Sequence, residues 1–90
     1  MSNVEPPKIE FPCSSYPIKV MGDTTPGFRE FVESVMQKHD ATFDTSTVKV
    51  RPSRNGRFES INVMITATGV DQLEAIFAEL KTNAAVRMVL

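Results

Sequence analysis

The sequence predicts an α+β fold, a four-stranded antiparallel sheet with two helices on one of its faces. Two stretches repeat apolar residues at helical spacing, and shorter stretches around them alternate apolar and polar residues as strands do. Their order is β-α-β-β-α-β, and right-handed crossovers place both helices of such an order on the same face of the sheet. The 90 residues are enough for one domain with a thin core of two layers.

Composition and charge exclude several classes of protein. Hydrophobic residues make up 41% of the chain and charged residues 23%, so a disordered or coiled-coil main state is excluded. The net charge of −1 gives no general attraction to nucleic acid or anionic lipid. The single cysteine can form neither an internal disulfide nor a zinc site, and no apolar run is long enough to span a membrane. These observations favour a cytosolic protein without a metal or cofactor.

Residues 1–14 are expected to form a flexible proline-rich arm, followed by a single ferredoxin-like domain over residues 15–90. Four of the six prolines lie among the first 17 residues, and proline fixes φ and removes a backbone donor. The first strand is expected at residues 18–21, where apolar and polar residues alternate until Gly22 ends the run.

The first helix is the clearest element of the sequence. Thr24 or Thr25 is expected to cap it, with Pro26 at the first helical position. His39, at its end, is expected to complement the helix C-terminus rather than to bind a metal. The apolar stripe before His39 has 3-4-3-4 spacing and consists of Phe28, Phe31, Val32, Val35 and Met36.

A hairpin is predicted after this helix. Val48 and Val50 alternate with basic residues, and Pro52 ends the strand. The pair Asn55-Gly56 is typical of a tight hairpin turn, which needs positive φ. Alternate residues over 61–67 are apolar, so a longer strand follows the turn.

The second helix and a last strand, over residues 85–90, complete the order. Thr68, followed by Asp71, resembles a capping box, and an apolar stripe runs from Val70 to Leu80. If both helices cover one face of the sheet, the predicted core holds Ile18, Val20, Phe31, Val35, Ile61, Val63, Ile65, Leu73, Phe77 and Leu80.

The opposite face of the sheet should stay open. Its expected side chains are Lys19, Met21, Lys49, Arg51, Phe58, Asn62, Met64 and Thr66. Thioethers among polar groups favour a contact surface for a protein partner or for a second subunit in a weak homodimer, and a solvated face with scattered apolar residues is the alternative. We expect this interaction face at Lys19, Met21, Phe58, Asn62 and Met64.

Four motifs resemble the YbeD-like family of small bacterial proteins. They are Phe11-Pro12, the run from Tyr16 to Lys19-Val20-Met21-Gly22, the strand over residues 62–68, and the terminal Val86-Arg87-Met88-Val89-Leu90. The resemblance covers the chain from Phe11 to Leu90. It implies a ferredoxin-like fold close to the ACT-type amino-acid-sensing regulatory domains and an association with lipoate metabolism by gene neighbourhood. It implies no known reaction and no catalytic residues.

The turn over residues 22–28 holds the candidate ligand site. ACT domains carry an acidic residue, a Pro-Gly pair and an apolar residue at this place, and the turn resembles that pattern with one residue more between the acid and Pro-Gly. The expected ligand-binding residues are Asp23, Thr24, Thr25, Gly27 and Phe28. Free amides at a helix N-terminus accept a carboxylate, and Asp23 accepts an ammonium group. The favoured alternative is that these residues only cap the helix.

Two further functions receive less support. Gly22 to Arg29 is similar to the phosphate loop of acylphosphatases, but Pro52 stands where that family has the water-orienting asparagine, and Asp23 would repel an anion. Arg54 and Arg57 belong to a basic cluster that raises the question of RNA binding, yet Phe58 alone could stack on a base there. The sequence therefore predicts a regulatory or interaction module, not an enzyme, whose ligand is a small metabolite carboxylate or amino acid or whose target is another protein.

Overall fold

The computed structural model describes residues 12–90 and confirms the predicted fold class. Its elements are β1 (Cys13–Asp23), α1 (Phe28–His39), a short 3-10 helix (Thr45–Thr47), β2 (Lys49–Pro52), β3 (Phe58–Ala67), α2 (Val70–Leu80) and β4 (Val86–Val89). The sheet has the order β2-β3-β1-β4, and each neighbouring pair is antiparallel. This is the ferredoxin-like arrangement.

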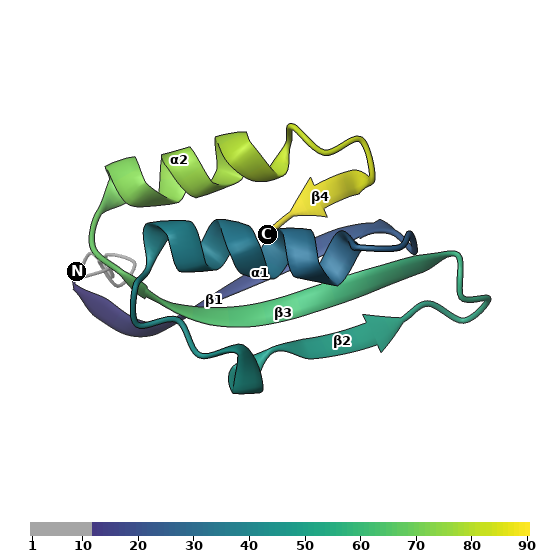
Figure 1. Ribbon diagram of the computed structural model, residues 1–90, viewed down its shortest axis with the longest axis horizontal. Coiled ribbons are helices and arrows are strands. Elements are labelled where there is room, and N and C mark those ends of the chain that lie inside the picture. The colour runs from purple at the N-terminus through teal and green to yellow at the C-terminus, as the bar shows by residue number, and fades with distance from the viewer. Residues whose placement is uncertain (1–11) are drawn as a thin grey trace, which may run out of the picture.

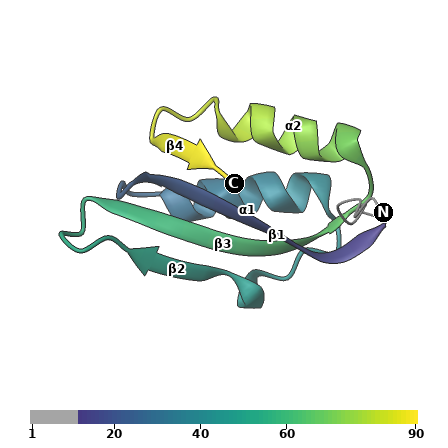
Figure 2. The same ribbon diagram turned by 180° about the vertical axis from the view of Figure 1, so that it is seen from behind.

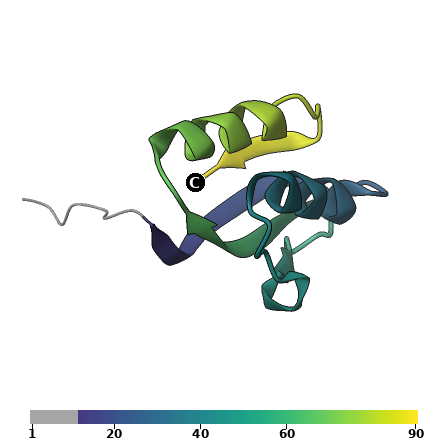
Figure 3. The same ribbon diagram turned by 60° about the vertical axis from the view of Figure 1, so that its left-hand side comes forward.

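Both helices lie on one face of the sheet. Figure 1 shows α1 in front of β1, with α2 next to β4, and in Figure 2, seen from behind, β1 lies in front of α1. Figure 3 shows α2 and β4 on one side of the domain and β2 with the 3-10 helix on the other. Within residues 12–90, no element covers the second face of the sheet, as the sequence predicts.

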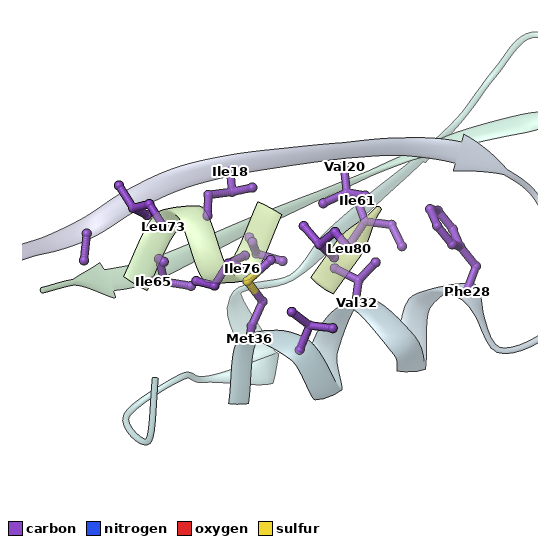
Figure 4. Packing of buried hydrophobic residues seen from close by; sticks show 13 residues of the cluster. Ile18, Val20, Phe28, Val32, Met36, Ile61, Ile65, Leu73, Ile76 and Leu80 are labelled. Carbon is purple, nitrogen blue, oxygen red and sulfur yellow. The ribbon is translucent and has the colours of Figure 1, made fainter. Parts of the chain in front are cut away.

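The core lies between the helices and the sheet, where side chains of β1, β3, α1 and α2 meet (Figure 4). Eight of the ten predicted core residues are buried, whereas Phe31 and Phe77 pack against the core only partly buried. The buried hydrophobic residues are Ile18, Val20, Phe28, Val32, Val35, Met36, Ile61, Val63, Ile65, Ala67, Leu73, Ile76 and Leu80.

The strand β1 begins at Cys13, earlier than the expected residue 18. Pro17 lies inside it, opposite Met64 of β3. The backbone N–H of Lys19 donates to Leu90 O at 3.0 Å, so the backbone nitrogen of Pro17, two residues earlier, points toward the same side of β1. In the described residues, β4 and the following Leu90 pair with β1 only from Lys19 onward. Pro17 therefore lacks a backbone donor at a position where no described strand would accept a hydrogen bond. The expected arm over residues 1–14 lies largely outside the described residues and stays a prediction.

The predicted cap of α1 is wrong. Gly27 is the N-cap residue, and no side chain makes a capping hydrogen bond, so neither Thr24 nor Thr25 caps the helix. Phe28 N donates to Thr25 O at 3.2 Å, and Gly27 has φ 81° and ψ 0°. These angles are those of the third residue of a type II turn, which favours proline at the second. Pro26 and Gly27 thus form a turn before the helix.

The predicted capping box of α2 is also wrong. Gly69 is the N-cap residue, and no side chain caps the helix. The side chain of Gln72 instead reaches back, and its Oε1 accepts a hydrogen bond from Thr68 N at 2.8 Å. The side chain of Gln72 therefore stabilises the start of α2, a role that the sequence assigns to Thr68 and Asp71.

The hairpin between β2 and β3 is confirmed, but its turn is longer than predicted. Gly56 has a φ of 74°, whereas Asn55 is not among the residues with positive φ. Gly56 N donates to Ser53 O at 3.0 Å, and Ser53 N donates to Phe58 O at 2.7 Å. The Asn55 side chain takes part by accepting a hydrogen bond from Arg57 N at 3.1 Å.

Gly22 allows β1, β4 and α1 to approach one another. A Cβ atom at this position would lie 2.6 Å from Cζ of Phe28 and closer still to the backbone oxygen of Ala85. Phe28 is 1% exposed, and its ring is packed in the core. A side chain at position 22 therefore conflicts with both the ring and the backbone before β4.

We expect Gly22→Ala to lower the free energy of unfolding by about 2 kcal/mol, because overpacking of a filled core forces side chains and backbone to shift. Urea denaturation of the full chain measures the effect. The matched control is Gly69→Ala, where an added Cβ meets no atom within 4 Å. This variant should lower the free energy of unfolding by less than about 1 kcal/mol. Equal losses for the two variants would contradict the close packing at Gly22.

Candidate functional site

The carboxylate of Asp23, the acid of the predicted ligand site, is bound to Arg87. Arg87 donates from Nε to Oδ1 of Asp23 at 3.1 Å and from its terminal Nη2 to Oδ2 at 3.0 Å. The hydrogen bonds to Asp23 and the charge of its carboxylate raise the pKa of Arg87. Each oxygen of the Asp23 carboxylate thus accepts one hydrogen bond from Arg87, so a ligand's ammonium group would share this carboxylate with the guanidinium.

Two other predicted ligand-binding residues of the turn, Thr24 and Phe28, already make contacts within the domain. The side chain of Phe28 lies in the core, and its backbone N–H already donates to Thr25. Thr24 N donates to Arg57 O at 2.9 Å, and Thr24, Thr25 and Gly27 are exposed. These contacts account for the turn as local structure. A ligand at residues 23–28 stays a prediction.

His39 forms a contact that joins the two helices. Its Nε2 lies 3.0 Å from Oε1 of Glu79, and Nζ of Lys38 lies 3.2 Å from the same oxygen. Hydrogen bonds from His39 and Lys38 lower the pKa of Glu79. Within residues 12–90, no three His, Cys, Asp or Glu side chains lie close enough together to hold a metal ion.

Asp40 is a buried carboxylate that the sequence reasoning missed. It is 7% exposed and follows the last residue of α1. Its Oδ1 accepts hydrogen bonds from Thr42 N at 3.0 Å and Thr42 Oγ1 at 2.6 Å, and its Oδ2 accepts one from Thr66 N at 2.9 Å. Burial raises the pKa of this carboxyl, but the three hydrogen bonds outweigh it and lower the pKa overall. The Asp-Ala-Thr motif at a helix end, typical of an Asx turn, was the available signal.

Gln72 completes the polar cluster at this end of the domain. Its Nε2 donates to His39 O at 2.9 Å and to Thr66 O at 3.2 Å. In the part of the chain that the structure describes, no buried side-chain nitrogen or oxygen lacks a partner. The groups around Asp40 and Gln72 are therefore fully used in connecting α1, β3 and α2, which is a structural role.

The open face of the sheet gathers the predicted interaction residues in register. Asn62 of β3 lies between Lys19 of β1 and Lys49 of β2, and a groove of about 660 Å³ runs over these three residues and Met64. Met21 and Phe58 line a smaller groove of about 260 Å³ beside it. The five residues predicted for the interaction face thus line two adjoining grooves.

Met88 and Leu90 extend this face, although they are not among the five residues predicted for it. Met88 of β4 is the register partner of Met21, and Leu90 exchanges two backbone hydrogen bonds with Lys19. Met64 is 47% exposed and Met88 50%. Only the pairing of β4 with β1 shows which side chains Met88 lies beside.

The charge of the open face is positive at its centre. Lys19 and Lys49 flank Asn62, and Arg51 lies opposite Ser60, the next residue of β3 on this face. Among the described residues, none of the ion pairs involves these three cations. Glu59, the acidic residue nearest to them along β3, borders the smaller groove. The face therefore combines exposed thioethers with three cations that form no ion pair among the described residues.

Residues 6–90 match a protein family described as "Protein of unknown function (DUF493)". The chain belongs to this family. It is similar to the UPF0250 protein of Azotobacter vinelandii, with 54% identity over 89 residues that cover 99% of this chain and 97% of that protein. A UPF0250 protein of Pseudomonas aeruginosa is 52% identical over 88 residues, covering 98% and 95%. The predicted YbeD-like family is thereby confirmed, and the names of these relatives state no activity.

Two solved structures share the fold of this DUF493 chain. One is the solution structure of a protein from H. pylori, with a TM-score of 0.70, 19% identity, and coverage of 100% of this chain and 93% of that one. The other is the ACT domain from GTP pyrophosphokinase of Chlorobium tepidum, with a TM-score of 0.62, 20% identity, and coverage of 82% and 80%. The predicted likeness to ACT domains holds for the fold. In the described part of the chain, neither helix is long and apolar enough to cross a membrane.

We expect Asp40→Asn to lower the free energy of unfolding at pH 7 by about 1–3 kcal/mol, because an amide has one acceptor oxygen in place of two and leaves one of the three donors around this buried side chain without an acceptor. The folded-state pKa of Asp40 is lowered, so its contribution is complete above the unfolded pKa of about 3.9 and is lost as the pH falls through the folded value. Urea denaturation at pH 7 and below pH 4 measures both effects.

The control for this variant is Asp71→Asn, at an exposed position in the first turn of α2. It should change the free energy of unfolding by less than about 0.5 kcal/mol. If the difference in free energy of unfolding between wild type and Asp40→Asn stayed constant from pH 7 to below pH 4, the role of the charged carboxylate would be contradicted.

Proposed function

We propose that the protein is a small regulatory or interaction module that binds a protein partner through the open face of its sheet. The observation that supports this most is the cluster of exposed Met21, Met64 and Met88 around cations that have no ion pair among the described residues. Methionine adapts its flexible side chain to an opposing surface, and exposed apolar patches rimmed by polar groups are typical of contact sites.

The proposal places the contact on the face and not in the turn over residues 23–28. In the turn, the carboxylate of Asp23 accepts hydrogen bonds from Arg87, and the ring of Phe28 packs close to Gly22 in the core. The open face has unused side chains and a groove of about 660 Å³. A partner that covers this face would remove the exposed thioethers from water, and burial of apolar surface is favourable by about 25 cal/mol per Å².

The test is site-specific photocrosslinking in cells that express the full chain. A photoreactive phenylalanine analogue replaces Met64 on the open face or, as the matched control, Val70 at the start of α2. The two positions are similarly exposed, at 47% and 57%. We expect Met64 to form a covalent adduct with a second protein, identified by mass spectrometry, and Val70 to form none at comparable yield.

Three outcomes would contradict the proposal. Equal adducts from both positions indicate non-specific contact, and the absence of an adduct at Met64 indicates a face that stays solvated. An adduct whose mass is twice that of the chain makes the face a self-association surface, which is the homodimer that the sequence predicts.

A further inference from the structure

We infer that the open face binds an amphipathic helix of a partner protein, in which an acidic residue lies between two apolar residues along one face. This inference rests on the proposed function and names the chemistry of the partner. It follows from the order in which cationic and apolar side chains succeed one another along the strands of the sheet.

The cations occupy the middle of the face. Lys19 and Lys49 lie on either side of Asn62, and since neighbouring strands are about 4.8 Å apart, their Cα atoms are separated by about 10 Å. Arg51 follows Lys49 on the same side of β2. Three cations around Asn62 and Ser60 suit a carboxylate, which can accept hydrogen bonds from ammonium, guanidinium and amide groups at once.

Apolar side chains lie at both ends of this cationic centre. Pro17 and Met64 form one register pair, before Lys19 in β1, and Met21 and Met88 form another, after it. All four residues are exposed. The face is therefore apolar, cationic and apolar along β1, and a complementary partner is apolar, acidic and apolar.

The spacing of these groups matches a helix. Pro17 and Met21 are about 13 Å apart along a strand that rises about 3.3 Å per residue, with Lys19 halfway. A helix rises about 1.5 Å per residue, so residues i, i+4 and i+8 span about 12 Å with the middle one at about 6 Å. A helix with apolar residues at i and i+8 and an acid at i+4 places each group opposite its complement, and docking of such helices on Met-rich surfaces is a known recognition mode.

Other occupants fit this face less well. A second copy, face to face, would bring two sets of the same three cations together, and opposed like charges disfavour binding. A nucleic acid would find cations for its phosphates, but the face offers methionines where base stacking needs aromatic rings, with Phe58 as the only aromatic side chain lining either groove described. The partner is thus an acidic segment of another protein.

The experiment measures fluorescence anisotropy of labelled peptides of about 18 residues, long enough to be helical, with the full chain. The first peptide carries Leu-Glu-Leu at i, i+4 and i+8. The second has Lys in place of the central Glu, and the third has the same composition as the first with the two Leu residues moved to opposite sides of the helix. We expect the first peptide to bind at least about tenfold more tightly than either of the others, and its binding to weaken with salt.

A charge reversal on the protein tests the same contact. Lys19→Glu should weaken binding of the Glu peptide by about tenfold or more and should strengthen binding of the Lys peptide. A mere loss of folding cannot strengthen binding. The matched control is Lys81→Glu, an equal charge change at an exposed residue after α2, which should alter binding by less than about twofold. Thermal unfolding by circular dichroism verifies that both variants are folded.

Equal binding of the Glu and Lys peptides, or no binding of the Glu peptide at millimolar protein, overturns the inference. Tighter binding of a single-stranded RNA than of the Glu peptide overturns it in favour of a nucleic-acid partner. These results are distinct from a failure of the proposed function, because a protein adduct at Met64 together with equal binding of the Glu and Lys peptides retains the interaction face and rejects its acidic helical partner.

Discussion

The antiparallel pairing of β1 with β3 determines which side chains of both strands face the helices. Ile18 and Val20 of β1 lie opposite Val63 and Ile61 of β3, and all four are buried. Since successive residues of a strand point to opposite faces, the same register places Lys19 beside Asn62 on the open face. A shift by one residue would exchange the two sets, bring Lys19 into the core and expose Ile18. The core and the candidate interaction face are therefore two results of one register.

The helical layer is held to this sheet by polar contacts as well as by apolar packing. Asp40 binds the N–H of Thr66 in β3, and Gln72 binds carbonyl oxygens of both His39 and Thr66. These bonds form where α1 ends, α2 begins and β3 leaves the sheet. The buried carboxylate of Asp40 and the half-buried amide of Gln72 are stable there because each has several hydrogen-bond partners. The polar cluster thus connects the helical layer to the sheet at one end of the domain, beside buried Ile65 and Leu73.

The sequence predicts the features of this fold that depend on periodicity. Its predictions fail where the structure of a segment depends on a turn or on contacts with another element. Ile61, Val63 and Ile65 are recognisable as a buried side by alternation alone. Thr25 looks like a cap, but the type II turn at Gly27 places the helix start two residues beyond the prediction. Asp40 looks like a solvent-exposed residue after a helix, because its burial depends on Thr66, which is 26 residues away. Local signals do not contain such long-range pairings.

The same limit applies to the candidate site. Lys19, Met21, Asn62 and Met64 could be assigned to one face from the predicted alternation of two strands. The partners of Met88 and the occupation of Asp23 by Arg87 required the register of β4 on β1, which the sequence does not specify. The ion pair with Arg87, which is 64 residues away, shows that Asp23 also holds the end of β1 to β4.

Pro17 has a consequence for the behaviour of this domain at high concentration. The four residues of β4 and Leu90 pair only with the later part of β1, so in the described part of the chain no strand covers the backbone groups on that side of its earlier part. Unpaired strand edges of this kind recruit further strands and are a common origin of fibrillar aggregation. The pyrrolidine ring removes a donor from the middle of that exposed stretch, and the irregular register between Cys13 and Tyr16, with Ser15 at a φ of 62°, distorts the strand before it. The domain can thus keep one broad surface available for recognition while its backbone resists growth into a continuous sheet.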